Sequence, residues 1–305
     1  MIKTLKKILN SNSHKLFLYL TLLLLFSIVC IILYKSINNF NSNNRISTFI
    51  NSSDPPVIIS HTKSFEILQN GILEDTQIKN IIQETLNNFN DKNENKNENE
   101  NELPNILHFI WIGSKIPDKY IENINTYIEN NPNYQIWLWH DNSTIYIDNK
   151  NIQLHHISEF EIINKYGFDT MSIWAGKADI LRYEIIYNYG GMYIDVDSRS
   201  LKPFNYTIFS KPFVCIETKG LFNNITNAQF GFQMKSKFLE FVIKCLGQNI
   251  ISNKKLDNIL YVCGPPFFTT CFYYWNSNNI TCINQDYVIL ENSFSYSYHT
   301  NDKNW

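Results

Sequence analysis

The sequence predicts an α/β fold, in which a mostly parallel sheet has helices on both sides. Residues 103–113 form an apolar run, residues 118–130 have helical spacing, and residues 134–140 have the β-branched and aromatic content of a strand. Further along, a helical pattern at residues 175–189 leads into a second short apolar run at residues 192–196. Alternating strands and helices of this kind build open sheets whose ligand crevice lies at the carboxyl ends of the strands. Functional residues are therefore expected at those strand ends.

Composition and charge narrow the class of function. The chain has 305 residues, of which 44% are hydrophobic and 15% aromatic, which is enough for one sizeable packed domain with accessory segments. Its formal net charge is only -2, and no dense block of lysine and arginine follows the amino terminus. A chain without a basic field is not suited to hold nucleic acid, so we expect no nucleic-acid partner.

Residues 16–34 are apolar and carry no charge. A helix of this length can cross a bilayer core of about 30 Å. A cleaved signal peptide is the alternative, but the run is long for one and no small-residue cleavage site precedes residue 35. More basic residues precede the apolar run than closely follow it. Those before it are Lys3, Lys6, Lys7 and Lys15, and those after it are Lys35 and Arg45. This asymmetry predicts a type II membrane protein with residues 1–15 in the cytosol and the remainder in the lumen.

The segment 35–102 is predicted to be a stem. It begins rich in Asn and Ser, continues with an amphipathic stretch, and ends in the sequence DKNENKNENENE at residues 91–102. The amphipathic stretch carries Ile78, Ile81, Ile82, Leu86 and Phe89. Because its last part contains no apolar residue, we expect a disordered linker there and place the catalytic domain at residues 103–305.

The strand predicted at residues 192–196 ends in an acidic pair, Asp195 and Asp197. Two carboxylates at i and i+2 can reach one ion if the strand ends there and their oxygens face an open crevice. Such oxygens suit Mg²⁺ or Mn²⁺, and a diphosphate is the natural third partner. An acidic pair alone is also common in solvated turns. The apolar strand before it, and a helix that carries Asp179 and Arg182, favour a functional site.

The order of these motifs resembles the DXD-containing, sugar-binding glycosyltransferases of family 32, which include fungal outer-chain and sphingolipid mannosyltransferases. Large clostridial glucosylating toxins are more distant relatives of that family. The residues that match are Ala178, Asp179, Arg182, Tyr183, Gly190, Gly191, Tyr193, Asp195 and Asp197. The resemblance implies a GT-A-like domain, which is a Rossmann-like nucleotide-diphospho-sugar transferase fold.

The resemblance also implies roles for four catalytic residues. Asp195 and Asp197 would bind Mn²⁺ or Mg²⁺ at the diphosphate, and Arg182 would add a charge-assisted contact to the donor. Asp179, one helical turn before Arg182, is suited to accept hydrogen bonds from sugar hydroxyls. The alternative for Asp179 is an ordinary salt bridge with Arg182 at i,i+3 spacing.

Four further positions match the family at the ends of the domain. Trp111 stands where the nucleotide base is expected to pack, although its spacing also fits a core tryptophan. His299 would approach the metal, and Asn304 and Trp305 would fold over the diphosphate, whereas the alternative is a disordered tail. Cys263 precedes Gly-Pro-Pro, a rigid turn, where the family usually has Thr, so the role of that hydroxyl is in doubt here.

Cysteines and glycosylation sequons fit a lumenal domain. Five cysteines follow the apolar run, at Cys215, Cys245, Cys263, Cys271 and Cys282, so they cannot all pair with one another, and no spacing suggests zinc. Sequons stand at Asn51, Asn142, Asn205, Asn224 and Asn279.

The function expected from these patterns is a metal-dependent, retaining glycosyltransferase in the Golgi or ER membrane. It would move a hexose from a nucleotide sugar, either GDP-mannose or a UDP-hexose, to a glycan or glycolipid acceptor. Nothing in the sequence chooses the base. Two other classes stay open: an inactive glycan-binding or scaffolding protein on the same fold, and a toxin-like glucosyltransferase that acts on a protein.

Overall fold

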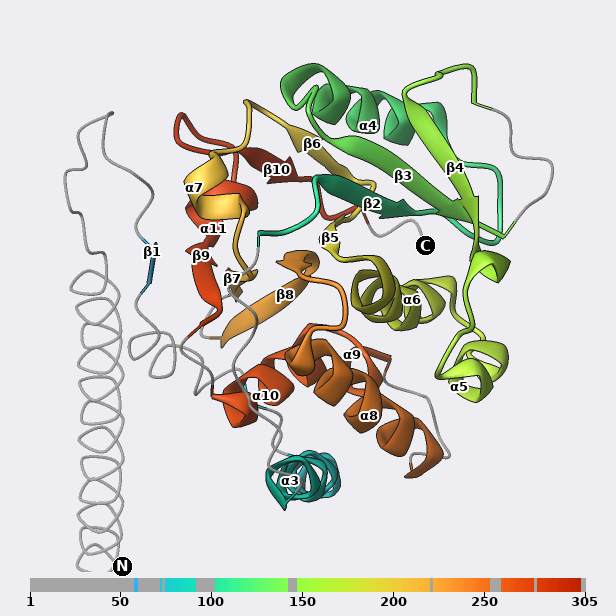
Figure 1. Cartoon of the computed structure of the whole chain (residues 1–305), viewed down its shortest axis with the longest axis vertical. Helices are drawn as coiled ribbons and strands as arrows, with labels where there is room; N and C mark the ends of the chain where they lie inside the picture. Colours follow the sequence, from blue (N-terminus) through green and yellow to red (C-terminus); the bar gives the residue numbers. More distant parts are fainter. Residues whose placement is uncertain are drawn as a thin grey trace, which may run out of the picture. The chain divides into compact units, whose positions relative to one another are not determined.

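The computed structural model describes residues 58–59, 72, 75–91, 102–141, 147–219, 222–252, 259–276 and 279–302 (Figure 1). Within these ranges, no helix combines the length and the apolar character needed to cross a membrane. The span predicted at residues 16–34 lies outside the described residues, as do residues 92–101 of the predicted linker.

An eight-stranded sheet forms the centre of the domain, in the order β1-β9-β7-β8-β5-β2-β3-β4. Its strands are β1 (Ile58–Ile59), β2 (Ile106–Ile110), β3 (Gln135–His140), β4 (Ile152–His156), β5 (Gly191–Ile194), β7 (Phe213–Lys219), β8 (Phe222–Phe232) and β9 (Thr281–Asn284). Two short strands, β6 (Ser198–Ser200) and β10 (Ser297–His299), pair antiparallel in a second sheet.

The large sheet is mixed. Strands β4, β3, β2 and β5 are parallel neighbours, as predicted for the first half of the domain. The second half differs, because β8 runs antiparallel to both β5 and β7. Only residues 220 and 221 separate β7 from β8, and so short a connection can join antiparallel neighbours but not parallel ones.

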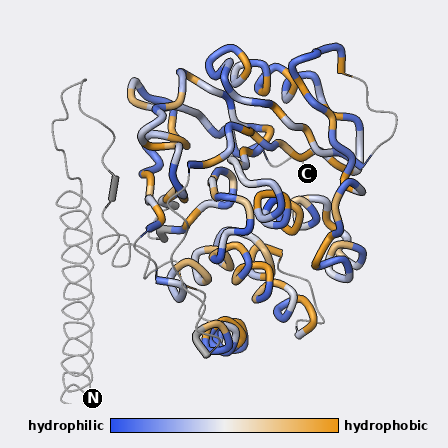
Figure 2. The backbone as a smooth tube through the Cα atoms, in the orientation of Figure 1, coloured by the Kyte–Doolittle hydropathy of each residue, from blue (hydrophilic) through white to orange (hydrophobic). Residues whose placement is uncertain are grey.

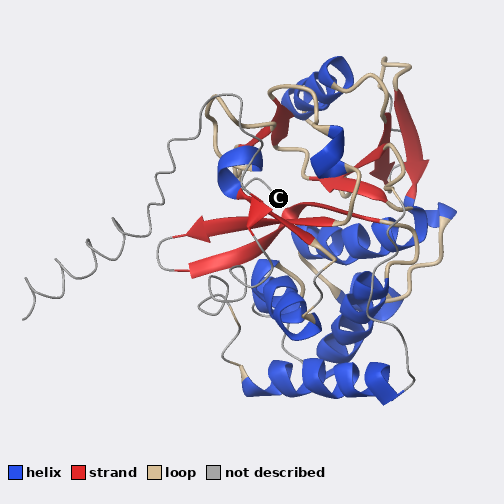
Figure 3. Cartoon of the chain, turned by 60° about the vertical axis from the view of Figure 1, so that its left-hand side comes forward, coloured by secondary structure: helices blue, strands red, loops and turns tan. Residues whose placement is uncertain are grey.

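Helices cover both faces of the sheet. They are α3 (Thr76–Asp91), α4 (Asp118–Asn130), α5 (Lys165–Thr170), α6 (Trp174–Tyr189), α7 (Tyr206–Phe209), α8 (Lys237–Ser252), α9 (Ile259–Val262), α10 (Pro265–Trp275) and α11 (Gln285–Val288), with a 3₁₀ turn η2 (Ile157–Glu159). Helix α4 lies on one side, and α3, α6, α8 and α10 lie on the other (Figures 1 and 3). The helices predicted at 118–130 and 175–189 are confirmed as α4 and α6.

Alternating side chains of each strand feed two cores. In β2, Leu107 and Phe109 belong to the core under α4, whereas Ile110 belongs to the core shared with α6 and α8. In β5, Met192 and Tyr193 divide in the same way. This is the period-two pattern of a strand buried on both faces. Figure 2 shows mostly hydrophilic residues along α4, whose inner face covers the more apolar strands.

Helix α3 comes from the segment predicted to be the stem, and it packs on the domain. Its apolar residues Ile78, Ile81, Ile82, Leu86 and Phe89 are all buried. Phe89 meets Phe241 of α8 and Trp275 of α10 edge-on, with ring centroids 5.7 and 5.8 Å apart. A helix from the predicted stem therefore contributes to the core that lies beneath α8 and α10.

The turn between α6 and β5 has to be Gly-Gly. Gly190 and Gly191 have φ angles of 68° and 95°, which side-chain-bearing residues rarely adopt. A Cβ on Gly191 would also lie 2.6 Å from the carbonyl oxygen of Ile106. The turn sends β5 to the opposite side of β2 from β3, so the strand order reverses between β2 and β5. A reversal of this kind is where open α/β sheets place their ligand crevice.

Candidate active site

Backbone hydrogen bonds hold the acidic loop after β5. The Asp195 N–H donates to the Ala228 carbonyl at 2.8 Å, and the Asp195 carbonyl accepts from the Ser198 N–H at 3.0 Å. On the α4 side, the Asn123 side-chain amide donates to the Val196 carbonyl at 3.0 Å. These contacts from β8, β6 and α4 favour one conformation of the loop.

The carboxyl-terminal segment closes on the same loop. Thr300 donates its N–H and its hydroxyl to the Asp197 carbonyl at 3.0 and 2.9 Å, and the Asp302 N–H donates to Asp197 Oδ2 at 2.8 Å. The Asp302 carboxylate in turn accepts from Lys119 and Tyr120 at the start of α4. Residues 300 and 302 therefore hold Asp197 directly, and the start of α4 holds Asp302.

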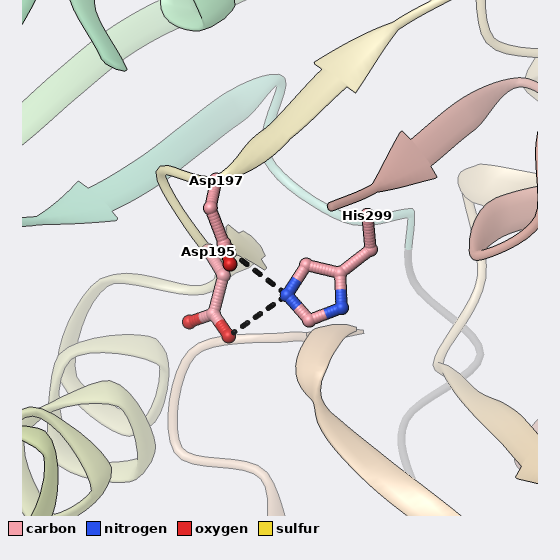
Figure 4. A group of neighbouring side chains, drawn as sticks. All are labelled: Asp195, Asp197 and His299. Carbon is pink, nitrogen blue, oxygen red and sulfur yellow. Dashed lines mark ion pairs between the residues drawn. The ribbon is translucent and has the colours of Figure 1, made fainter. Parts of the chain in front are cut away.

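Pairing of β6 with β10 brings His299 to the acidic pair. His299 stands opposite Ser198 in this small sheet. Its Nε2 lies 2.9 Å from Asp197 Oδ1 and 3.7 Å from Asp195 Oδ2 (Figure 4). One ligand atom from each of the three residues falls within 4.8 Å of the others. The structure thus gathers the three predicted metal ligands at one point.

The second oxygen of each carboxylate is held by the protein. Asp195 Oδ1 accepts from the Tyr193 hydroxyl at 2.5 Å and contacts Arg182 Nη1 at 3.2 Å. Asp197 Oδ2 accepts from the Asp302 N–H. The oxygens left over, Asp195 Oδ2 and Asp197 Oδ1, both face the His299 ring (Figure 4).

The donor set of this cluster fits a divalent cation. Apart from its contact with His299, the buried Asp197 Oδ1 has no hydrogen-bond partner in the described part of the chain. Two carboxylate oxygens and one imidazole nitrogen are ligands that Mn²⁺ accepts readily and Mg²⁺ accepts in part. A bound cation would give Asp197 Oδ1 the partner that it otherwise lacks.

Burial and mutual charge shift the pKa values in the cluster. Burial raises the pKa of Asp195, which the nearby Arg182 guanidinium opposes and the Asp197 charge reinforces. For His299, burial disfavours the charged ring, but the hydrogen bond and the charge of Asp197 outweigh it and raise the pKa.

Arg182 is buried between both acidic groups. Its Nη2 lies 3.0 Å from Asp179 Oδ1, so the i,i+3 salt bridge considered from the sequence is present. Its Nη1 contacts Asp195 and also donates to the Asn227 carbonyl at 2.7 Å. The guanidinium lies over the Tyr193 ring, 4.5 Å from its centroid. Arg182 therefore fixes the two carboxylates relative to each other.

Asp179 is in contact with Asn227 and Cys263. The sequence did not predict either contact. The Asn227 amide donates to Asp179 Oδ1 at 2.8 Å, and the Cys263 thiol lies 3.6 Å from Oδ2. Burial raises the pKa of Asp179 to about 6, although Arg182 acts in the opposite direction. Cys263, which stands where the family usually has Thr, therefore lies beside Asp179.

Trp111 lies just beyond β2 and is buried, with 6% of its surface exposed. Its indole N–H donates to the Ser114 carbonyl at 3.0 Å, and its ring packs against Tyr120 at a centroid distance of 5.1 Å. Asn304 and Trp305 lie outside the described residues. Helix α10 begins at Pro265, so the Gly-Pro-Pro segment that follows Cys263 starts a helix.

Comparison with known proteins relates part of the chain to a known family. Residues 117–214 match the family described as "Glycosyltransferase sugar-binding region containing DXD motif". This part of the chain is therefore similar to the DXD-containing glycosyltransferases. Asp179, Arg182, Asp195 and Asp197 all lie within the matched region, and His299 lies beyond it.

Several curated proteins are similar to part of this chain. "Inositol phosphoceramide mannosyltransferase 3" of Schizosaccharomyces pombe is 27% identical over 183 residues, which cover 57% of this chain and 46% of that protein. "Uncharacterized glycosyltransferase L373" of Acanthamoeba polyphaga mimivirus is 25% identical over 209 residues, which cover 66% of this chain and 76% of that protein. The matched part spans about half the length of the yeast mannosyltransferases.

A solved structure shares the fold of this chain. "PaToxG Glycosyltransferase" superposes with a TM-score of 0.51 at 19% identity, covering 66% of this chain and 80% of the other. The GT-A-like α/β fold that the resemblance implies is confirmed at this level.

Proposed function

We propose that this chain transfers a hexose from a nucleotide sugar to a glycan or glycolipid acceptor, with a divalent cation held by Asp195, Asp197 and His299. The observation that supports this most directly is the convergence of three ligand atoms within 4.8 Å, at the carboxyl end of β5. The family match over residues 117–214 and the mannosyltransferase names of the yeast relatives agree with it.

The chemistry follows from the leaving group. Breaking the bond between the sugar and a nucleoside diphosphate builds negative charge on the diphosphate, which bound Mn²⁺ or Mg²⁺ would neutralise. The protein's part is to fix the site: Arg182 and Tyr193 hold one oxygen of Asp195, and Asp302 holds one oxygen of Asp197. Asp179 is then free to accept a hydrogen bond from a sugar hydroxyl.

The family resemblance implies retention of the anomeric configuration. In a same-face reaction the acceptor hydroxyl would pass its proton to an oxygen of the departing phosphate. No nucleophilic side chain is then required. The buried contacts of Arg182 make it a positioning residue for Asp179 and Asp195 in this proposal, rather than an arm that reaches the diphosphate.

The remaining donor contacts are also proposals. Trp111 would pack against the base. Because this residue is only 6% exposed, the turn at Ser114 would have to move before a base could reach the ring. Asn304 and Trp305 would cover the diphosphate from the chain end. The choice between GDP-mannose and a UDP-hexose stays open, and the names of the yeast relatives make GDP-mannose with a phosphoinositol lipid acceptor the first combination to try.

We also propose a type II topology, in which residues 16–34 span an ER or Golgi membrane and residues 35–102 lead to a lumenal catalytic domain. The uncharged run and the lysine asymmetry around it support this arrangement. A glycolipid acceptor would then lie in the same membrane as the enzyme.

Ligand-induced thermal stabilisation tests the proposed function. The purified full chain in detergent would be melted with Mn²⁺ and GDP-mannose, UDP-galactose, UDP-glucose or UDP-N-acetylglucosamine. One of these should raise the melting temperature, and EDTA should remove the effect, because a ligand that binds only the folded state stabilises it. The same donor should be hydrolysed slowly without acceptor. No stabilisation by any of the four, or donor hydrolysis that persists in excess EDTA, would count against the proposal.

A further inference from the structure

Four buried residues form a closed ring of hydrogen bonds beside the metal cluster. Asp179 and Tyr183 come from α6, Asn227 from β8, and Cys263 from the residue pair before α10. Asn227 Nδ2 donates to Asp179 Oδ1 at 2.8 Å and to the Tyr183 hydroxyl at 3.1 Å. The Tyr183 hydroxyl donates to the Cys263 carbonyl at 2.8 Å, and the Cys263 thiol approaches Asp179 Oδ2 at 3.6 Å.

The ring treats the two oxygens of Asp179 differently. Oδ1 receives two strong donors, the Asn227 amide and Arg182 Nη2, at 2.8 and 3.0 Å. Among the described residues, Oδ2 is contacted only by the Cys263 thiol, and S–H is a weak donor. Since a carboxylate oxygen has room for more than one hydrogen bond, Oδ2 is the atom that can still accept one from a ligand.

A β-bulge places Asn227 in this ring. Between β7 and β8, Val214 pairs with Phe230, and the next residue, Cys215, pairs with Thr226. Residues 227–229 of β8 therefore have no partner on β7. A bulge re-aims side chains and is frequent beside active sites. Here it turns Asn227 toward α6, where its carbonyl accepts from Arg182 while its amide donates to Asp179.

We propose that Asn227 is a positioning residue that holds Asp179 with Oδ2 facing a hydroxyl of the donor hexose. This inference rests on the proposed function and adds to it the residue that sets recognition of the sugar, as distinct from the nucleotide. Asp179 is linked through Arg182 to Asp195, which would hold the cation at the diphosphate, so a nucleoside diphosphate without its sugar should not use the ring.

The test compares a nucleotide sugar with its own nucleoside diphosphate. Dissociation constants for GDP-mannose and GDP, and for UDP-glucose and UDP, would be measured with Mn²⁺ on the full chain in detergent. Asn227→Ala should raise the dissociation constant of whichever nucleotide sugar binds by about tenfold, which is the usual order for losing a hydrogen bond at a charged group. The dissociation constant of the matching nucleoside diphosphate should stay within about twofold of the wild-type value. Asn227→Leu, which is similar in size and lacks the donor, gives the same comparison where the alanine variant fails to fold.

Asn164→Ala is the matched control. Asn164 is also a buried asparagine, and its amide donates to the Ile243 carbonyl at 3.2 Å, in the core beneath α8. It should lower the melting temperature and leave the ratio of the two dissociation constants unchanged. The proposal would be overturned if the Asn227 variants raised both dissociation constants by the same factor, or raised neither. A wild-type chain that binds neither pair would overturn the proposed function itself.

Discussion

One guanidinium joins two carboxylates that have different tasks. Arg182 contacts Asp179, which would meet the sugar, and Asp195, which would meet the cation. All three side chains are at most 13% exposed, so these charges are paired with one another rather than solvated. Removing one partner of such a group leaves a buried charge uncompensated and commonly costs about 3–5 kcal/mol. Variants of Arg182 would therefore confuse loss of fold with loss of function.

Asp197 offers a cleaner test, because its free oxygen lies in the cluster with His299. Asp197→Asn should reduce turnover by about a hundredfold or more, since it weakens charge stabilisation at the leaving group, while the amide keeps one oxygen to accept from the Asp302 N–H. The melting temperature without metal should stay near that of wild type. Mn²⁺ affinity, measured by calorimetry, should fall in step with turnover.

A surface carboxylate serves as the control for Asp197→Asn. Asp169 pairs with Lys165 on α5 and is half exposed, so Asp169→Asn should change neither Mn²⁺ affinity nor turnover. Wild-type Mn²⁺ affinity in Asp197→Asn would rule out the assignment of that residue as a ligand.

Glu184 predicts a pH dependence of stability that is separate from the metal site. It is fully buried on α6 and accepts from the N–H groups of Ile163 and Asn164 at 2.7 and 2.8 Å. Burial raises its pKa to about 7 from 4.5. The folded state then holds the proton more tightly than the unfolded state. Stability from this group is complete below about pH 4.5 and is lost as the pH rises through about 7.

Glu184→Gln should remove that dependence. The free energy of unfolding of the wild type, relative to the variant, should fall by up to about 3 kcal/mol between pH 4.5 and 7.5, since each unit of pKa shift is worth about 1.4 kcal/mol. Urea denaturation of both proteins across this range measures the difference. Parallel curves for the two proteins would show that Glu184 titrates normally.

At the residue scale, the sequence supports the acidic pair and the Asp179 to Arg182 helix, because their spacing on one strand end and one helix face is local. The contacts of Asn227 and Cys263 carry no such signal. Asn227 is one of many asparagines, and its partner Asp179 lies 48 positions away. His299 could be proposed only from the family resemblance, since no local pattern ties it to a loop a hundred positions earlier.

Among the elements, α3 makes the sharpest prediction. Phe89→Ala should lower the free energy of unfolding by about 3–5 kcal/mol, because it leaves a cavity between Phe241 and Trp275. Asn87→Ala, at an exposed position of the same helix, should change it by no more than about 0.5 kcal/mol. Equal and small effects of the two variants would mean that α3 does not belong to the core.

Elements with their own periodicity were predictable, and those defined by partners were not. The bounds of α4 agree with prediction because Asp118 follows a proline and its apolar positions recur with helical spacing. The β6–β10 sheet has only three residues per strand, too few for any pattern. The amphipathic stretch of α3 was visible, but the surface that it covers belongs to helices more than 150 positions later.

For the whole molecule, the proposed type II topology predicts which parts of the chain an external protease can reach. In sealed microsomes, external protease should remove no more than the first 15 residues and leave the catalytic domain intact. Detergent should make that domain accessible, which controls for intrinsic resistance. Digestion of the domain in sealed vesicles would end the type II proposal.

The β6–β10 pairing has a consequence for the order of folding. Thr300 contacts Asp197 across a separation of 103 residues, so the proposed metal ligands meet only after the sheet between them has formed. Contacts of such long sequence separation carry a high loop-closure entropy and tend to form late. A cation that binds the folded site would then stabilise β10 against local opening. Amide hydrogen exchange at Ser297–His299 should therefore become slower when the cation is added, even without a sugar donor.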